Sequence, residues 1–345
     1  YPKKQKELWD EGYDDEEQDY VGSKWGKYLR APQVFFKVLE KGVGKLVLIK
    51  HIAKIGRGLR TGDNEYFYLD ANEVNKWHLH KFVKPLVKSP KDSNCILLSK
   101  ANLKYWVFMV DNDLEQLINT SAYKYIQFGI QRGVPDKRKK LRWWSLQGEC
   151  INAEILIPVQ IWDTYKIFVN DLQDQVFYDQ QLSGIMTGSK TLAKTIATFL
   201  VSTLGNLLLE VYGRRQLGEG SLQIPTEDLK NIVVLNPNSL SLEQVSKLHE
   251  IFDALSMRPL SSIFEELSAN SRDEVSLDKV KPDRRKLDEI IMGEILGLTD
   301  EEQLEVYRAI VDLVKSRIER AKSVEAKKKQ RGEKELDALV NLIVD

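Results

Sequence analysis

Several features that define familiar protein classes are scarce in this chain of 345 residues. It has two cysteines, too few for a disulfide framework, and their apolar neighbours predict buried thiols in a reducing cytoplasm. Its four histidines are scattered, so we predict no metal site. The longest apolar stretch, 196–211, is interrupted by polar residues such as Asn206 and Glu210, which excludes a membrane span.

The chain also has no net charge, because 51 basic and 51 acidic residues cancel. A simple basic DNA-binding module usually carries excess positive charge, since phosphate neutralisation supplies much of its affinity. The charges here are unevenly distributed, however. Residues 10–19 contain seven acids and no base, whereas 124–144 contain seven bases and one acid. We therefore predict a basic surface formed locally by the second segment.

Strand-like segments alternate with turns up to residue 238, and helix signals dominate after it. In the first region, 189–211 is the one long helix candidate, with Ser189 as its cap and Gly213 as its stop. These patterns predict an α+β protein: a mixed, largely antiparallel β domain with inserted helices at 31–238, then an all-α helical domain at 239–345. The predicted strands include 46–55, 66–69, 95–99, 105–110, 155–159 and 166–169.

Three capping motifs mark helix starts in the C-terminal region, at Ser241, Ser262 and Thr299. Further along, apolar residues recur at intervals of three and four, which places them on one seam of a long C-terminal helix. This seam forms either the flank of a helical bundle or an intermolecular coiled coil. Its residues are Leu304, Tyr307, Val311, Val314, Ile318 and Ala321.

The glycine-rich segment 57–64 is the first candidate binding element, because it lies between two predicted strands. It would present Arg57 and Arg60 on a flexible turn, with Thr61 and Asn64 as shorter hydrogen-bonding groups. Arginine pairs bidentately with guanine or phosphate, and asparagine pairs with adenine. We predict that this loop contacts DNA, and that Arg60 lies closer to the DNA than Arg57 does.

A basic loop at 132–142 is the second candidate, since lysine and arginine brought to phosphates release condensed counterions. Two tryptophans follow it; in a strand they would face opposite sides, leaving one free to cover a groove. Two further loops place cations near helix ends, where phosphates bind. The candidates from these three segments are Arg132, Lys137, Arg138, Lys139, Lys140, Arg142, Trp144, Ser189, Lys190, Arg214 and Arg215.

Six segments spread over nearly the whole chain carry a resemblance to a known family. They are 24–32, 57–64 with 66–68, 83–90, 142–146, 218–224, and 284–288 running into 296–299. In this order and spacing they resemble the specificity half of adenine-specific DNA methyltransferases from restriction-modification and related phage-defence systems. The resemblance implies that 31–238 is a DNA target-recognition domain and that duplex DNA is its partner.

The catalytic motif of that family is absent from the chain. These enzymes carry an Asn-Pro-Pro-Tyr type of tetrapeptide, and the nearest segment here, 236–239, lacks the second proline and the ring. No glycine pair opens a convincing cofactor-binding βαβ unit. We assign no catalytic or cofactor-binding residue, and we expect S-adenosylmethionine to bind a methyltransferase domain elsewhere in a larger parent polypeptide. Residues 1–30 would be the acidic linker from it, and a nuclease domain or subunit would be a further partner.

Two other functions compete with this one. The chain can be a protein-interaction scaffold that uses the helical seam, in which case it would have no DNA affinity. It can also be a nuclease, but neither Pro135-Asp136 nor Pro282-Asp283 is followed within about twenty residues by the acid-x-lysine pair that such enzymes need. We rank the nuclease last.

Overall fold

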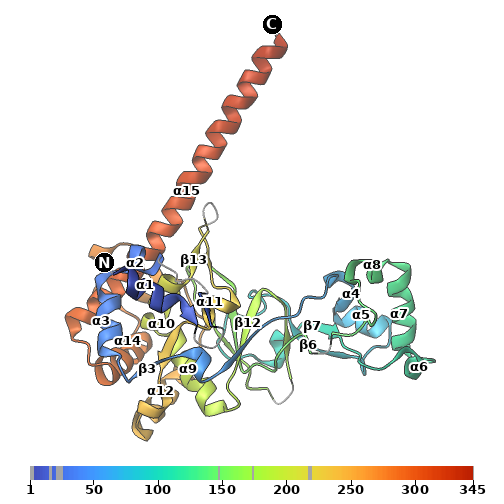
Figure 1. The fold of residues 1–345 in the computed structure, drawn as a ribbon, viewed down its shortest axis with the longest axis horizontal. Helices are drawn as coiled ribbons and strands as arrows, with labels where there is room; N and C mark the ends of the chain where they lie inside the picture. The colour runs from blue at the N-terminus through green and yellow to red at the C-terminus, as the bar shows by residue number, and fades with distance from the viewer. Residues whose placement is uncertain are drawn as a thin grey trace.

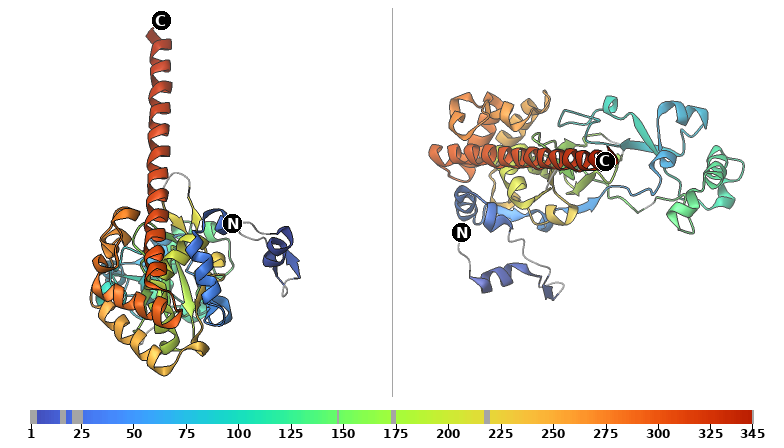
Figure 2. Two further views of the ribbon diagram at one scale, coloured as in Figure 1. Left: turned by 90° about the vertical axis from the view of Figure 1, so that its left-hand side faces the viewer. Right: turned by 90° about the horizontal axis from the view of Figure 1, so that it is seen from above.

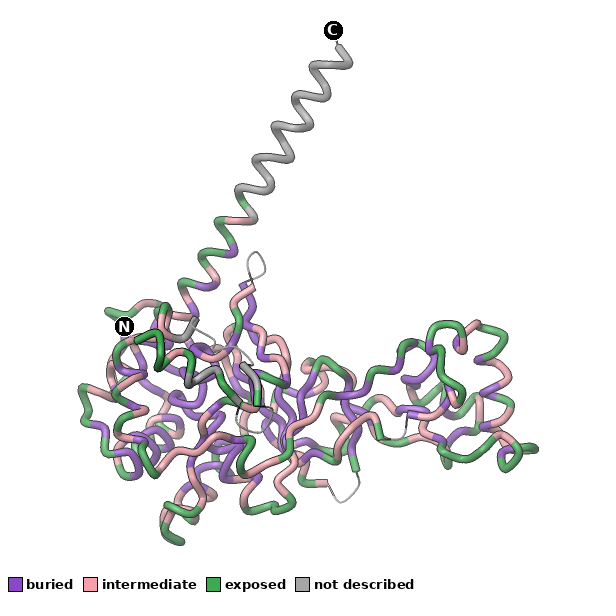
Figure 3. The backbone as a smooth tube through the Cα atoms, viewed as in Figure 1, coloured by how far each residue is buried: buried purple, intermediate pink, exposed green. Residues whose placement is uncertain are grey.

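The computed structural model describes residues 4–14, 18–20, 26–146, 148–172, 175–216 and 220–344. Figure 1 shows a larger body, a smaller lobe that extends from it, and a long C-terminal helix that projects from the body. Figure 3 shows buried residues gathered inside both the body and the lobe. Parts of the predicted linker 1–30 and of the segments 24–32 and 218–224 lie outside the described residues.

The central sheet of the body has the strand order β10-β8-β12-β4, and all its neighbours are antiparallel. Two buried helices, α9 (Lys190–Val201) and α10 (Thr203–Tyr212), follow β12 and form the centre of the main hydrophobic core. The strands are β4 (Lys54–Arg57), β8 (Ile155–Pro158), β10 (Phe168–Val169) and β12 (Leu182–Met186).

Shorter strands and helices complete the body around this centre. Figure 2 shows that the N-terminal elements and the C-terminal helices lie on the same part of the molecule. The strand pairs are β1 (Tyr13–Asp14) with β2 (Asp19–Tyr20), β3 (Leu46–Leu48) with β15 (Val233–Leu235), and β14 (Leu222–Gln223) with both β9 (Gln160–Ile161) and β13 (Arg214–Arg215). The short helices are α1 (Gln5–Gly12), α2 (Gly26–Arg30), α3 (Gln33–Lys41) and α11 (Thr226–Leu229).

The small lobe has its own sheet and its own core. The sheet order is β11-β6-β7-β5, in which only β11 and β6 are parallel among these strands. Aromatic rings fill the core, and Tyr66 stacks on Tyr125 with 4.7 Å between ring centroids. The elements are β5 (Tyr68–Leu69), β6 (Val83–Val87), β7 (Tyr105–Phe108), β11 (Phe177–Tyr178), α4 (Asn64–Phe67), α5 (Ala71–Lys76), α6 (Leu114–Leu117), α7 (Ser121–Gln131) and α8 (Val134–Arg138).

The C-terminal region is helical, as predicted, and the α+β fold class is confirmed. All three predicted caps form: the hydroxyls of Ser241, Ser262 and Thr299 accept hydrogen bonds from the amides three residues on. The helices are α12 (Leu242–Ser256), α13 (Ile263–Leu267), α14 (Pro282–Asp288), the π-helix η6 (Glu289–Ile295) and α15 (Asp300–Val344).

The seam of α15 packs inside the body instead of facing a second molecule. Tyr307, Val311 and Val314 are fully buried, and Leu304 and Ile318 pack against the same core. That core also contains Val34 and the sheet residues before 238, so the change in composition at 238 does not coincide with a break in packing. The bundle interpretation of the seam is therefore correct for 304–321.

The predicted long helix 189–211 is wrong in one respect, because it is two helices. α9 and α10 meet at Ser202 with an angle of 77° between them. Ser202 ends one helix by donating to the carbonyl of Phe199, and it caps the next by accepting from the amide of Gly205. A serine that satisfies both helix ends makes the bend. Together the two helices have the length and apolar composition of a broken span, and no single described helix does.

Three predicted strands also differ from the structure. Segment 46–55 divides into β3 and β4, because a 3-10 turn at Ile49–His51 separates them. Segment 66–69 starts as helix α4, since Asp63 caps it, and only Tyr68 and Leu69 are extended. Segment 95–99 forms only an isolated bridge, between Leu97 and Val169. The described residues contain no cluster of potential metal ligands, and both cysteines are free and half-buried.

Candidate nucleic-acid interface

The two predicted basic segments meet in the small lobe although about 80 residues separate them in the sequence. Arg138 donates a hydrogen bond of 2.5 Å to the backbone carbonyl of Thr61. Lys137 pairs with Asp63 at 2.6 Å, and Arg132 pairs with Glu65 at 3.2 Å. The glycine-rich loop and the basic segment thus form one surface, at α4 and α8 in Figure 1.

The glycine-rich loop is not flexible at its base, because it is bound to the chain before β12. The amide of Leu59 donates to the carbonyl of Tyr178 at 2.8 Å, and the amide of Gln180 donates back to Leu59 at 3.1 Å. Gly58 lies so close to this segment that an added Cβ would stand 2.1 Å from the carbonyl oxygen of Asp179. Only glycine allows this approach.

The buried carboxylate of Asp179 fixes the loop through hydrogen bonds. It accepts hydrogen bonds from the hydroxyl of Tyr68 at 2.8 Å, the side-chain amide of Asn64 at 3.3 Å and the backbone amide of Gln181 at 2.9 Å. Burial, with the nearby Asp179 charge, raises the pKa of Tyr68, so this phenol stays a donor. Sequence reasoning missed Asp179 and Gln180, because an isolated Asp-Gln pair carries no local signal.

The loop contains both exposed and buried residues. Arg57 and Arg60 are exposed, whereas Thr61 is buried. The Thr61 hydroxyl donates to the side-chain oxygen of Asn64 and accepts from the amide of Asp63. The prediction that Thr61 is offered to DNA is therefore wrong. Asn64 is exposed, but its amide oxygen already accepts from Thr61 and its amide nitrogen already donates to Asp179.

The two loop arginines differ in their surroundings. Arg60 is exposed and donates from Nε to the side chain of Gln180 at 3.1 Å, a bond that restrains the guanidinium. Arg57 ends β4 opposite Ser183, and it has no ion pair within the described residues. Both arginines can donate to a ligand.

Residues 134–138 of the basic segment form a short helix, α8, where the sequence predicted a loop. Gly133 enters it and Lys139 leaves it with φ values of 71° and 52°, both in the left-handed region. Arg138 is buried, so its predicted DNA contact is wrong. Its guanidinium donates to Thr61, to the carbonyl of Ser145 and to Glu149, and it lies over the ring of Phe67. Arg138 thus connects α8 to the glycine-rich loop and to the chain at 145–149.

Acids distant in the sequence neutralise most of the basic segment. Of the seven bases in 124–144, only Lys124 and Lys139 are free of an ion pair in the described part of the chain, and both are exposed. The local excess of charge is therefore smaller than the sequence count implied. The pairs are Arg132 with Glu65, Lys137 with Asp63, Arg138 and Lys140 with Glu149, and Arg142 with Asp111 and Asp113.

Both tryptophans after the basic segment belong to the lobe core. Trp143 and Trp144 are 5% and 6% exposed and lie in a turn, not a strand. The indole of Trp144 donates to the carbonyl of Asn112 at 3.2 Å. The prediction that Trp144 covers a groove is wrong, since two adjacent rings in a turn can both point inward.

The remaining candidates lie in the body. Ser189 caps α9 by accepting from the amide of Leu192, and exposed Lys190 pairs with Asp171 at 3.0 Å. Arg214 forms a bidentate pair with the buried carboxylate of Asp228, with distances of 2.6 and 2.9 Å. Arg215 makes only a long contact of 3.5 Å with the carbonyl of Leu313. Arg214 is therefore committed to a structural pair, and Arg215 is not.

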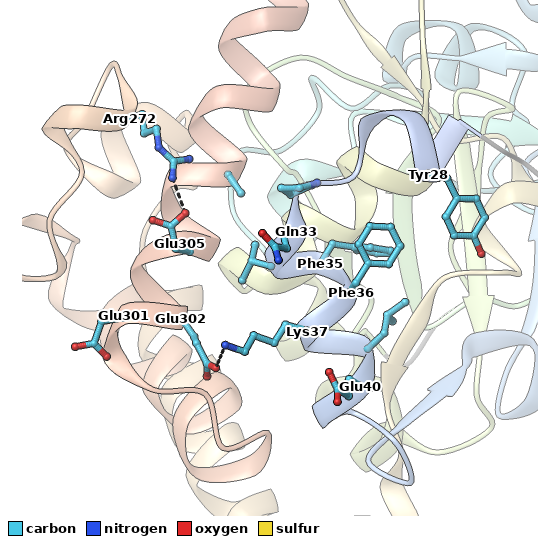
Figure 4. Close-up of a pocket in the computed structure, with 14 residues that line it drawn as sticks. Tyr28, Gln33, Phe35, Phe36, Lys37, Glu40, Arg272, Glu301, Glu302 and Glu305 are labelled. Carbon is cyan, nitrogen blue, oxygen red and sulfur yellow. Dashed lines mark hydrogen bonds and ion pairs between the residues drawn. The ribbon is translucent and has the colours of Figure 1, made fainter. Parts of the chain in front are cut away.

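A cavity of about 1150 Å³ lies elsewhere, between α3 and α15. Figure 4 shows Lys37 directed at Glu302, with which it pairs at 2.6 Å, and Arg272 directed at Glu305, with which it pairs at 2.5 Å. Phe36 and Tyr28 line the opposite wall with stacked rings, 5.9 Å between centroids. The pair of Lys37 with Glu302 connects α3 to α15, and none of the predicted site residues lines this cavity.

Comparison with known proteins places the chain in a family. The family model described as the Type II methyltransferase M.Eco57I, C-terminal domain, matches residues 23–267. Because this match covers more than half of the chain, the chain belongs to that family. It is a methyltransferase-family C-terminal domain.

Two solved structures have a similar fold. The type IIG restriction endonuclease BpuSI matches with a TM-score of 0.56 and 11% identity, over 89% of this chain and 35% of that one. The Type IIL restriction-modification enzyme MmeI, solved in complex with DNA, matches with a TM-score of 0.50 and 14% identity, over 81% and 36%. The chain thus spans about a third of each enzyme.

A curated sequence, the ATP synthase gamma chain of Blochmanniella pennsylvanica (strain BPEN), is 24% identical over 133 residues. The match covers 36% of this chain and 44% of that protein. An identity this low over a minor part of the chain shows no family.

Proposed function

We propose that this chain recognises a duplex DNA sequence for an adenine-specific DNA methyltransferase of a restriction-modification or phage-defence system. Arg57, Arg60 and Lys139 would make the contacts. The observation that carries the proposal is the bond between Arg138 and Thr61, which joins two sequence-distant segments. It brings exposed Arg60 and Lys139 onto one lobe, and exposed Arg57 lies where β4 of the body leads into the same loop. Membership of the methyltransferase C-terminal family supports it.

The contacts that hold these side chains in place suit the recognition of a DNA sequence. A contact that distinguishes bases needs donors held in a fixed position, because bidentate pairing with guanine depends on geometry. The buried Asp179 network fixes the loop backbone, and Gln180 orients Arg60. Lys139 follows the end of α8 and is a mobile point charge better suited to phosphate. One lobe then supplies both base reading and backbone positioning.

Methyl transfer would occur in a domain outside this chain, which binds S-adenosylmethionine as the cofactor of the parent protein. The adenine must leave the helix before transfer, so the recognition lobe would hold the distorted duplex against that domain. A nuclease domain or subunit would be a further partner, and the system would act in the cytoplasm. The competing scaffold hypothesis loses its proposed surface, because the seam of α15 is buried in the body.

The test is a fluorescence-anisotropy titration of this chain with labelled duplex DNA at several salt concentrations. We expect duplex binding that weakens with salt, and a marked loss of affinity in the double variant Arg57→Ala and Lys139→Ala. The matched control is Lys124→Ala, which removes an exposed, unpaired charge on α7. Equal affinity in the double variant and the control would contradict the proposal.

Calorimetry with S-adenosylmethionine tests the other half of the proposal. If methyl transfer belongs to another domain, this chain should give no heat of specific binding. Micromolar affinity for S-adenosylmethionine would overturn the assignment.

A further inference from the structure

The turn between β11 and β12 lies beside the glycine-rich loop and joins the sheet of the lobe to the sheet of the body. Asp179 and Leu59 pair across the contact as an isolated parallel bridge. Within the turn, the amide of Leu182 donates to the carbonyl of Asp179 at 2.9 Å, and the amide of Gln181 donates to the Asp179 carboxylate at 2.9 Å. The backbone of Gln180 is therefore held in place by both the turn and the loop.

The side chain of Gln180 extends to Arg60 on the neighbouring loop. Its Oε1 atom accepts a hydrogen bond from Nε of Arg60 at 3.1 Å, and both residues are exposed. No other side-chain hydrogen bond engages either residue within the described ranges. Because an amide oxygen has a second lone pair and an amide nitrogen has its own N–H groups, Gln180 can still accept and donate. Arg60 likewise keeps its terminal N–H groups.

The remaining groups of Gln180 match adenine. In the major groove adenine presents N7 as an acceptor and the N6 amine as a donor, and a glutamine amide can bond to both. Guanine presents two acceptors there, N7 and O6, which the terminal N–H groups of an arginine can occupy together. If Arg60 binds a guanine in this way, that base has no acceptor left for Gln180. Gln180 must then bond to another base.

We propose that Arg60 and Gln180 read two neighbouring base pairs of duplex DNA, a guanine through Arg60 and an adenine through Gln180. The two side chains are 3.1 Å apart at their contact, and successive base pairs are about 3.4 Å apart along the helix, so the pair spans one step of the duplex. The inference rests on the proposed function and names part of the DNA sequence that the lobe recognises. The adenine read here stays in the duplex, unlike the adenine that is extruded for methylation.

Gln181 provides a matched control in the same turn. It is exposed, as Gln180 is, and it follows Gln180 directly in the chain. Its side-chain amide donates to the carbonyl of Lys88 at 3.3 Å, and it makes no hydrogen bond to Arg60 in the described structure. Changing Gln181 therefore removes the same kind of side chain and leaves the contact between Arg60 and Gln180 intact.

The first experiment selects duplexes from a random library with the wild-type chain, and then measures affinities for single-base variants of the selected duplex by fluorescence anisotropy. The wild type should select a guanine with an adenine, on either strand, at the adjacent base pair. Gln180→Ala should lose a preference of about tenfold for that adenine and keep the guanine, whereas Gln181→Ala should keep both. A wild-type motif without such an adenine, or an unchanged adenine preference in Gln180→Ala, would overturn the inference.

Gln180→Glu tests the inference by a change of specificity. A carboxylate can still accept from Nε of Arg60, but it has no N–H to donate to adenine N7, and it accepts instead from the N4 amine of cytosine. The preferred base at this pair should therefore change from adenine to cytosine by about tenfold, with the guanine retained. If both Gln180 variants alter only the guanine preference, Gln180 positions Arg60 without reading a base, and the inference is wrong.

The outcomes separate this inference from the proposed function. The side chain of Gln180 is exposed, so its variants should unfold at the wild-type temperature, and thermal unfolding checks this. If Arg60→Ala loses a base preference while both Gln180 variants keep the wild-type motif, the inference fails and the proposed function stands. If the wild type selects no motif, both are contradicted.

Discussion

The buried guanidinium of Arg138 and the backbone carbonyl of Thr61 are 2.5 Å apart, and this bond connects the basic helix α8 to the glycine-rich loop. The same guanidinium bonds to Glu149 and to the carbonyl of Ser145. Because one side chain holds three segments, the position of the exposed cations depends on a residue that cannot itself reach DNA. This separates the residues that support the surface from those that form it.

Arg138→Ala is therefore expected to destabilise the small lobe. It takes this donor away from two carbonyls and leaves the carboxylate of Glu149 with Lys140 alone, which should cost about 3 kcal/mol. Lys139→Ala, one position away and exposed, should change stability by less than about 0.5 kcal/mol. Tryptophan fluorescence during urea unfolding reports on this lobe, because Trp143 and Trp144 lie in its core. Equal midpoints for the two variants would show that Arg138 does not support the lobe.

Gly58→Ala tests the close approach between the loop and the chain before β12. The new Cβ would stand 2.1 Å from the carbonyl oxygen of Asp179, so the backbone must move, at a cost of roughly 3 kcal/mol. Gly44→Ala is the control. The φ of Gly44 is +76°, but a Cβ added there would meet no atom within 4 Å, so backbone strain alone should cost about 1 kcal/mol. Thermal unfolding of both variants gives the comparison. A Gly58 variant as stable as the Gly44 variant would mean that the loop is free to shift.

The lysines of the basic segment should contribute unequally to the slope of log affinity for DNA against log salt concentration. From the sequence, each of the four residues 137–140 would contribute about one unit of slope if each neutralised a phosphate. In the structure, Lys137 and Lys140 are paired with Asp63 and Glu149, so each should contribute less than Lys139 does. Single alanine variants, titrated with duplex DNA at several salt concentrations, measure this order. Equal contributions from all three lysines would mean that the ion pairs open on binding.

Low pH should loosen the contact between α3 and α15. Partial burial raises the pKa of Glu302, but hydrogen bonds from Lys37, Lys41 and the amide of Thr299 outweigh this and lower it to about 2. Since the folded pKa lies below the ordinary value of 4.5, the stabilisation is complete above pH 4.5 and is lost as pH falls towards 2.

Glu302→Gln should remove this part of the pH dependence, and thermal unfolding between pH 2 and pH 7 measures it. Glu301→Gln is the matched control, because Glu301 is exposed beside it. If the unfolding temperature of the wild type varied with pH in the same way as that of Glu302→Gln, the stabilisation assigned to Glu302 would be contradicted.

The sequence predicted the parts of this fold that local chemistry decides. The caps at Ser241, Ser262 and Thr299 form because a hydroxyl three residues before an amide is sufficient for them. The seam of α15 follows equally from its period. The bend at Ser202 was missed, although serine is a capping residue, because the apolar residues on both sides continue the helical pattern.

The site was harder to predict than the fold, because pairing between distant residues decided it. Charge counted along 124–144 overlooked Asp63, Glu65 and Glu149, which only the folded chain brings to the same place. Arg138 and Lys139 are neighbours in sequence, yet one is buried and the other exposed. Nothing in the local pattern distinguishes them.

The central claim is that the small lobe reads DNA through Arg60, and selection from a random duplex library tests it most directly. The wild-type chain and Arg60→Ala would each be mixed with the library, and the bound duplexes sequenced. The account predicts a recurrent motif for the wild type, and for Arg60→Ala a lost preference at one base pair, equivalent to about 1 to 3 kcal/mol. An identical motif from both proteins, or no motif from either, would contradict it.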